Sequence, residues 1–230
     1  MSTANPAVRV DASAATARAG FIRQTYLHVA LAIAAFAALE WLLLQLPGVR
    51  DVARVMTGGY NWLAVMLAFM IVSRIADGWA RSSTSPGRTY AGLGLFVVAQ
   101  AILFLPLMYR VSRQGDDVLG SAALITALMV AGLTAVVVLT RTDFSFLRTA
   151  LTIGGFVALG LIVASIVFGF SLGILFAAAM VAFASGSILY NTSNIMRTYR
   201  TDQPVAAALS LFSSIALLFW YVLSITSRRR

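Results

Sequence analysis

Residues 176–200 read FAAAMVAFASGSILYNTSNIMRTYR, a stretch that turns from apolar to polar without becoming charged before Arg197. Its first half is almost wholly Ala, Met, Val and Phe, whereas Ser and Asn residues crowd its second half. An unpaired amide or hydroxyl in hydrocarbon costs about 2–7 kcal/mol, so these polar groups must pack against other helices or line a wet cavity. The stretch therefore predicts one helix of a larger membrane bundle.

The composition of the whole chain is typical of a membrane protein with several spans. Of its 230 residues, 60% are hydrophobic and 11% are charged, and the mean hydropathy is +0.88, values that ordinary soluble domains do not reach. The chain has no Cys, which excludes disulfides, thiolate metal sites and cysteine catalysis. His28 is the only His, so neither a metal site nor a cofactor is expected.

All basic residues are Arg, and the absence of Lys excludes a retinal protein, which needs a Lys for its Schiff base. The net charge of +9 lies at predicted helix ends and in short loops, a pattern that the positive-inside rule explains better than nucleic-acid binding does. An intramembrane serine protease would need a base near Ser185 or Ser187, and the only His lies near a helix end. We therefore expect no enzymatic activity and assign no catalytic residue.

Seven apolar segments are candidates to cross a bilayer, since a crossing helix needs about 20 residues. They run roughly over residues 26–46, 62–75, 90–108, 118–139, 147–168, 172–190 and 205–225. We predict an all-α integral membrane protein, a seven-transmembrane-helix bundle over residues 25–226. Residues 1–24 are a polar, Arg-bearing tail, and residues 227–230 are a short Arg tail.

The distribution of arginines predicts the orientation of the chain. They are more numerous in the N-terminal tail and in the loops after the second, fourth and sixth segments than in the other loops. The positive-inside rule therefore places the N-terminus in the cytoplasm. The closing Arg228 to Arg230 conflicts with this rule if there are seven spans, and the alternative is a re-entrant last segment that returns the tail to the cytoplasm. Residues 205–225 are long enough to cross, which favours seven spans.

Small residues in the sixth segment predict close helix packing. Gly169 and Gly173 bracket a tight hairpin at GxxxG spacing, and Ala178, Ala182 and Gly186 continue a small stripe beyond it. Because close packing of small residues holds helices together in lipid, we expect this stripe to face the inside of the bundle.

Two charged residues lie within apolar segments. Glu40 lies inside the first segment, where a carboxylate is either a functional group or a protonated or interface-facing side chain. Arg74 lies near the inner end of the second segment, and Asp77 follows on the same helical face, so a gating role and a local ion pair are both open. Arg74 should also lie at a depth close to that of Asn191.

The polar residues Ser187, Tyr190, Asn191 and Thr192 form the candidate functional cluster. They either line a pore or form a hydrogen-bonded helix end. His28, at the inner mouth of the first segment, is interpreted as a headgroup-level polar residue rather than a proton relay.

The order and spacing of several motifs resemble the Bax inhibitor family of membrane proteins, the transmembrane Bax-inhibitor-motif proteins, including its bacterial branch. The resemblance covers nearly the whole chain. It rests on residues 21–30 (FIRQTYLHVA), residues 123–126, residues 140–147 (TRTDFSFL), residues 186–195 (GSILYNTSNI) and residues 208–223 (ALSLFSSIALLFWYVL). It implies seven helices with the last one central, and for some members a pH-sensitive calcium leak.

This chain departs from the family at the positions that sense pH. Calcium-leak members carry two acidic residues that share a proton, and the corresponding positions here are Asn191 and Ser214. An amide and a hydroxyl cannot titrate, and they lack the anionic oxygens that Ca²⁺ prefers. The resemblance implies that Arg74 corresponds to an Arg of the second helix that pairs with the acids in the family.

Two functions follow from the resemblance. The first is a leak for Ca²⁺ or other cations in a bacterial inner membrane that lacks the acid-pair sensor. The second is a non-conducting regulator of a membrane-bound ATP-dependent protease or of a stress response. The expected surroundings are the lipid bilayer, with no nucleic acid.

Overall fold

The computed structural model describes residues 9–82 and 85–228, and within these ranges the fold is entirely helical. The elements are η1 (Val10–Ala12), α1 (Ala15–Gln45), α2 (Val49–Thr57), α3 (Asn61–Ala80), α4 (Pro86–Ser112), α5 (Asp116–Thr140), α6 (Leu147–Phe168), α7 (Gly173–Arg197) and α8 (Pro204–Thr226). Pro86 and Pro204 each stand in the first turn of their helix, where a missing backbone N–H costs nothing.

Seven of these helices are long and apolar enough to cross a membrane, which confirms the predicted fold class. The bounds of α6 agree with the prediction, whereas α3, α4 and α7 extend beyond the apolar segments. The prediction missed α2, a short helix between the first two spans, because its Arg and Asp residues make it too polar and too short to span.

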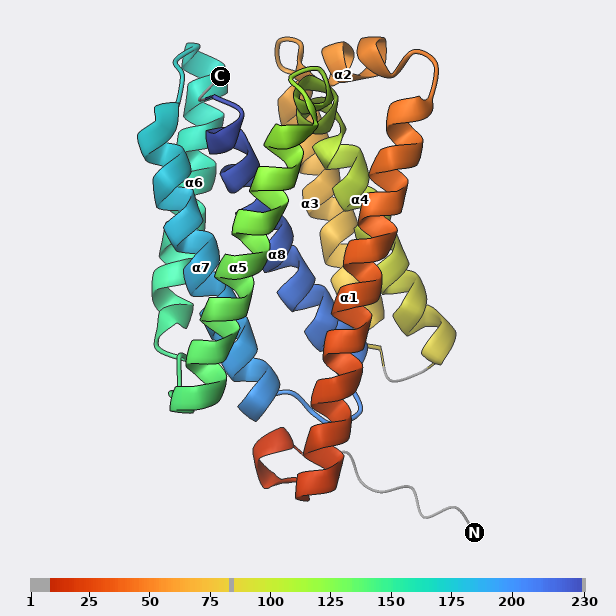
Figure 1. Cartoon of the computed structure of the whole chain (residues 1–230), viewed down its shortest axis with the longest axis vertical. Coiled ribbons are helices and arrows are strands. Elements are labelled where there is room, and N and C mark those ends of the chain that lie inside the picture. Colours follow the sequence, from red (N-terminus) through yellow and green to blue (C-terminus); the bar gives the residue numbers. More distant parts are fainter. Residues whose placement is uncertain (1–8, 83–84, 229–230) are drawn as a thin grey trace.

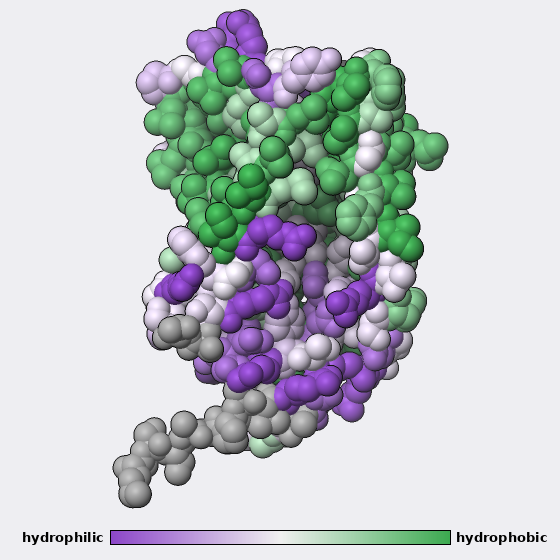
Figure 2. Space-filling model, turned by 180° about the vertical axis from the view of Figure 1, so that it is seen from behind, coloured by the Kyte–Doolittle hydropathy of each residue, from purple (hydrophilic) through white to green (hydrophobic). Residues whose placement is uncertain are grey.

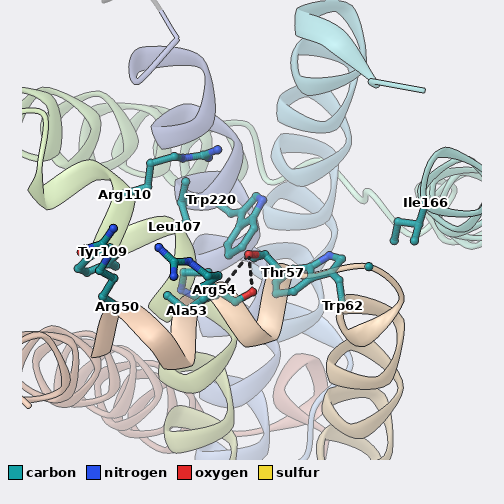
Figure 3. A pocket seen from close by; sticks show the side chains of 12 residues that line it. Arg50, Ala53, Arg54, Thr57, Trp62, Leu107, Tyr109, Arg110, Ile166 and Trp220 are labelled. Atoms are coloured by element: carbon teal, nitrogen blue, oxygen red, sulfur yellow. Dashed lines mark hydrogen bonds between the residues drawn. The ribbon is translucent and has the colours of Figure 1, made fainter. Parts of the chain in front are cut away.

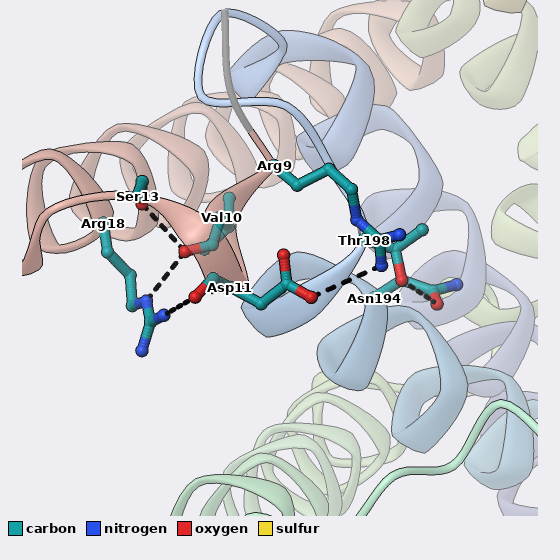
Figure 4. Close-up of polar contacts among 7 residues, drawn as sticks. All are labelled: Arg9, Val10, Asp11, Ser13, Arg18, Asn194 and Thr198. Atoms are coloured by element: carbon teal, nitrogen blue, oxygen red, sulfur yellow. Dashed lines mark hydrogen bonds and ion pairs between the residues drawn. The ribbon is translucent and has the colours of Figure 1, made fainter.

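The N-terminal end of the bundle is more ordered than a polar tail suggests. Helix α1 begins at Ala15, inside the predicted tail of residues 1–24. Before it, η1 is tied to the end of α7: Val10 is fully buried, and its N–H donates to the Tyr199 carbonyl at 3.0 Å. The Arg18 guanidinium donates to the carbonyl groups of Val10 and Asp11 (Figure 4). These bonds join the start of the first span to the end of the sixth.

Helix α8 is the centre of the bundle and is surrounded by the other helices (Figure 1). It packs against α1, α3, α4, α5 and α7. Phe212 of α8 meets Phe36 of α1 and Phe96 of α4 edge to face, with ring centroids 6.1 Å apart in both pairs. This arrangement confirms that the last helix is central.

Helix α8 crosses the bundle fully, because it runs along the long axis from the end where α1 begins to the end where α2 lies (Figure 1). The described part of the C-terminal tail, Ser227 and Arg228, therefore lies at the α2 end, and the re-entrant alternative is wrong. Figure 2 shows apolar residues covering the part of one face nearer α2, while hydrophilic residues gather toward the N-terminal end. On this face, the half nearer the N-terminal end is thus the more polar one.

The small stripe of α7 does not face the core as predicted. Ala178 and Ala182 are exposed and Gly186 is half-buried, whereas Ala177, Ala184 and Ile188 are buried. Small residues lie on two faces of α7. The contacts of α7 with α8 and α5 bury the face that carries Ala177 and Ala184. The hairpin prediction agrees with the structure, since Gly169 and Gly173 have φ of 73° and 61°, which favour glycine.

Candidate functional site

Asn191 and Ser214, which the family resemblance predicts to be the sensor-equivalent positions, lie in direct contact between α7 and α8. The Asn191 amide Nδ2 donates to Ser214 Oγ at 2.8 Å and to the Ser210 carbonyl at 3.2 Å. Ser214 is only 6% exposed, and its hydroxyl donates in turn to the Ser210 carbonyl at 3.3 Å. We call Asn191, Ser210 and Ser214 the α7–α8 contact. It is a neutral hydrogen-bonded group in which no member carries charge between pH 5 and 8.

Tyr199, which follows α7, extends this contact toward the N-terminal end. Its hydroxyl lies 2.8 Å from Ser210 Oγ, and Ser210 Oγ also donates to the Ala206 carbonyl at 3.2 Å. Sequence reasoning missed Ser210 and Tyr199, although Ser210 stands one helical turn before Ser214 and so shares its face. Each neutral hydrogen bond contributes about 0.5–1.5 kcal/mol.

A second group of hydroxyls lies on three helices around the same end of the bundle. The Tyr26 hydroxyl of α1 lies near the hydroxyls of Thr134 on α5 and Thr192 on α7. None of the three has a partner of full hydrogen-bond geometry in the described chain, and Thr192 is completely buried. Buried hydroxyls that lack protein partners are the kind of groups that ordered water satisfies. Of the predicted cluster, Thr192 therefore belongs to a polar interior.

The other members of the predicted cluster, Ser187 and Tyr190, lie outside both the α7–α8 contact and the group of buried hydroxyls. Ser187 donates to the Phe183 carbonyl of its own helix at 3.1 Å, and Tyr190 is half-buried. Ser193, by contrast, is buried and accepts the Phe144 N–H at 3.2 Å, which ties the α5–α6 loop to α7. His28 is half-buried, with Nδ1 2.7 Å from the Gln24 carbonyl.

The α5–α6 loop is held at a second point. The Arg197 guanidinium donates to the Arg141 carbonyl, at a residue that has positive φ after α5. Within the loop, the Ser145 N–H donates to Asp143 at 2.9 Å and lowers the pKa of that carboxyl. The loop is thus fixed against the polar end of α7.

The structure does not bring Arg74 into the α7–α8 contact. Arg74 is exposed on α3, and the described side chains give it no hydrogen bond or ion pair. Asp77 instead accepts from Arg81 Nε at 2.9 Å, so the predicted local pair with Arg74 is wrong. The Arg81 guanidinium also lies 6.0 Å from the centroid of the Tyr199 ring. Arg81 is thus linked to the α7–α8 contact through Tyr199, whose hydroxyl meets Ser210 Oγ.

Glu40 is separate from this site. It stands 14 positions after Tyr26 on α1, about 21 Å along the helix axis at 1.5 Å per residue. Its side chain is 1% exposed, and neither carboxyl oxygen has a hydrogen-bond partner among the described residues. The interface-facing interpretation of Glu40 is therefore wrong, because the carboxyl lies inside the bundle.

Replacing Glu40 is expected to stabilise the protein. Glu40→Leu removes an unpaired buried carboxyl and adds apolar contact, which should raise the free energy of unfolding by about 1–3 kcal/mol. Glu40→Gln is the matched control, because an amide at this position stays unpaired and should change stability little. Thermal unfolding in detergent measures both, and a lower melting temperature for Glu40→Leu would show that the carboxyl has a stabilising partner.

A pocket of about 670 Å³ opens at the α2 end of the bundle and is rich in arginine. Arg50 and Arg54 reach it from α2, and Arg110 reaches it from the end of α4 (Figure 3). Trp220 of α8 and Trp62 of α3 also line the pocket, and their rings stack with centroids 6.1 Å apart. This entrance to the bundle is therefore positively charged.

The described residues contain no cluster of three or more His, Cys, Asp or Glu side chains that could hold a metal ion. The polar interior between α1, α5, α7 and α8 offers hydroxyls and one amide instead.

A family model and two relatives each match most of the chain. A family model described as "Inhibitor of apoptosis-promoting Bax1" matches residues 18–230. An uncharacterized protein of Pseudomonas aeruginosa is 34% identical over 209 residues, which cover 90% of this chain and 88% of the relative. An uncharacterized protein of Caulobacter vibrioides is 30% identical over 237 residues, which cover 95% and 92%.

Proposed function

Because this chain belongs to the Bax inhibitor family of membrane proteins, we propose that it is a non-conducting member whose α7–α8 contact does not respond to pH. The hydrogen bond from Asn191 to Ser214 carries this proposal. Two carboxyl groups at this distance would share a proton and separate when both ionise. An amide and a hydroxyl keep the same hydrogen bond at every physiological pH, so the two helices stay joined.

The charge of the α2-end pocket supports a non-conducting role. Arg50, Arg54 and Arg110 line the pocket, and no acidic side chain stands among its described lining residues. Like charges gathered in a concave, partly apolar site repel an approaching cation. A divalent cation such as Ca²⁺ is repelled twice as strongly as a monovalent one.

In this proposal the protein acts through a membrane partner and not through catalysis. The regulator function would place the chain in a bacterial inner membrane with its N-terminus in the cytoplasm, as the arginine distribution predicts. A membrane-bound ATP-dependent protease is the partner class that the family resemblance suggests. The polar N-terminal end, with its fixed α5–α6 loop, is the surface that such a cytoplasmic partner would meet.

A pH-independent cation leak is the second candidate, and one observation favours it. The hydroxyls of Tyr26, Thr134 and Thr192 lie buried near the α7–α8 contact without full hydrogen-bond partners. Such groups can be hydrated, and a hydrated interior is a requirement of a conducting path.

Flux through proteoliposomes distinguishes the two candidates. We expect no Ca²⁺ or monovalent cation flux above protein-free vesicles at any pH from 5 to 8. A steady flux that does not vary with pH would favour the leak and contradict the non-conducting proposal. A steep change of flux near neutral pH would contradict both, since it would require a titrating gate.

A further inference from the structure

The arginine-lined pocket at the α2 end continues into a deeper apolar cleft. The cleft has a volume of about 500 Å³ and shares Trp62, Arg110, Ile166 and Trp220 with the pocket above it. Its further lining is mostly apolar and includes Met66, Phe69, Leu103, Leu159, Ile162 and Phe176. The two spaces therefore form one site with a cationic entrance and an apolar interior.

The described lining of the entrance contains arginines and no acidic side chain. Arg50 and Arg54 stand one turn apart on α2 and point into the same pocket as Arg110 of α4 (Figure 3). Arg228, which follows α8, is among the residues that line the apolar cleft. Guanidinium groups bind phosphate oxygens through paired N–H donors, so this group of arginines is suited to a phosphate.

The cleft below reaches well into the bundle. Gln100 lines it and stands ten positions before Arg110 on α4, which corresponds to a depth of about 15 Å. The cleft runs between α3 and α6, and α6 packs against α7 rather than closely against α3. A cleft of this depth between separated membrane helices is open to an acyl chain.

Helix α2 places the entrance at the surface of the bilayer. Its Arg50 and Arg54 line the pocket, whereas Val52 and Val55 on other faces are 50% and 63% exposed. A short helix with separate cationic and exposed apolar faces lies in the interface, at the level of lipid headgroups. The charged part of a lipid in that leaflet is thus at the height of the arginines.

We propose that the Arg50, Arg54 and Arg110 pocket with its cleft binds an anionic phospholipid, whose phosphate contacts the arginines and one of whose acyl chains enters between α3 and α6. A soluble anion would leave the apolar cleft unfilled, and a zwitterionic lipid would leave the arginines without net compensation. This site is separate from the α7–α8 contact and goes beyond the proposed regulatory role.

Lipid retention tests the proposal. The full chain is purified from vesicles that hold equal amounts of phosphatidylglycerol and phosphatidylcholine with the same acyl chains, and retained lipid is measured by native mass spectrometry. We expect phosphatidylglycerol to be enriched about tenfold, the ratio that corresponds to about 1.4 kcal/mol. Equal retention of the two lipids would overturn the proposal.

Two pairs of substitutions localise the lipid. Arg54→Gln with Arg110→Gln should abolish the enrichment, whereas Arg23→Gln with Arg148→Gln removes the same charge from exposed arginines near the opposite end and should leave it intact. An equal loss in both double variants would show that net charge, and not this pocket, selects the lipid.

Filling the cleft tests the acyl-chain part of the site. Ile162→Trp should lower phosphatidylglycerol retention at least fivefold while the melting temperature stays near that of the wild type; Ile162→Phe replaces it if Ile162→Trp does not fold. Unchanged retention would exclude a chain in the cleft. Glycerol phosphate is not expected to displace the lipid, and displacement by it, or a copurifying polypeptide in place of the lipid, would contradict a phospholipid site.

Discussion

Gly92→Ala is expected to destabilise the protein by about 3 kcal/mol or more, at the upper end of the range for overpacked cores. A Cβ at Gly92 of α4 would lie 2.6 Å from both the Ala76 carbonyl oxygen and the Ala80 nitrogen of α3. Both obstacles are backbone atoms of one helix, so no side-chain rotation relieves the overlap and α3 and α4 must separate. Thermal unfolding in detergent should show a melting temperature about 6–12 °C lower.

Gly94→Ala is the matched control two residues further along α4. Gly94 is exposed, and an added Cβ would have no neighbour within 4 Å. Replacing a glycine inside a helix by alanine should then stabilise by about 0.5–1 kcal/mol. If Gly92→Ala and Gly94→Ala shift the melting temperature alike, the close approach of α3 and α4 does not exist in solution.

The double variant Asn191→Asp with Ser214→Asp should make stability strongly dependent on pH. Two carboxyl groups would then lie at the α7–α8 contact, where the like charges and burial raise their folded-state pKa above the unfolded value of about 3.9. An acid with a raised folded pKa stabilises fully below its unfolded pKa and loses that stability as the pH rises through the folded pKa. For a rise of about 3 units, about 4 kcal/mol is lost between pH 4 and pH 7.

Melting temperatures measured at pH 4.5 and pH 7.5 check this prediction. The wild-type difference should be small, because Asn191 and Ser214 do not titrate, and the double variant should melt at a clearly lower temperature at pH 7.5. Asn191→Asp alone is the control, since the Ser214 hydroxyl can donate to a single carboxylate and limit the cost. A double variant with a flat pH profile would show that the two side chains do not meet.

Much of the fold follows from sequence because length and hydropathy decide which segments cross a bilayer. The seven spans and the central last helix were predicted in this way and from the family resemblance, and both are confirmed. Helix α2 escaped prediction because hydropathy alone does not separate a short amphipathic helix from a polar loop. Its signal is the spacing of Arg50 and Arg54 on one side and Val52 and Val55 on others.

The partners of individual side chains were predicted less well. Asp77 can reach an arginine three residues before it or four residues after it, and helix geometry allows either pair. Arg81 forms the pair because it lies just after α3, near the Tyr199 ring. In the same way, α7 carries small residues on two faces, and only its neighbours decide that Ala177 and Ala184 are buried while Ala178 and Ala182 are not.

The sequence by itself determined that this protein is a helical membrane bundle, since length and hydropathy are local properties, and the family resemblance predicts that Asn191 and Ser214 stand where calcium-leak members carry their acidic pair. Only the tertiary structure decided that Asn191 and Ser214 share a hydrogen bond, that Glu40 is buried with no hydrogen-bond partner among the described residues, and that Arg50, Arg54 and Arg110 line one pocket. These juxtapositions depend on how the helices pack and rotate about their axes. That packing follows from many weak contacts along the whole length of α8 and its neighbours.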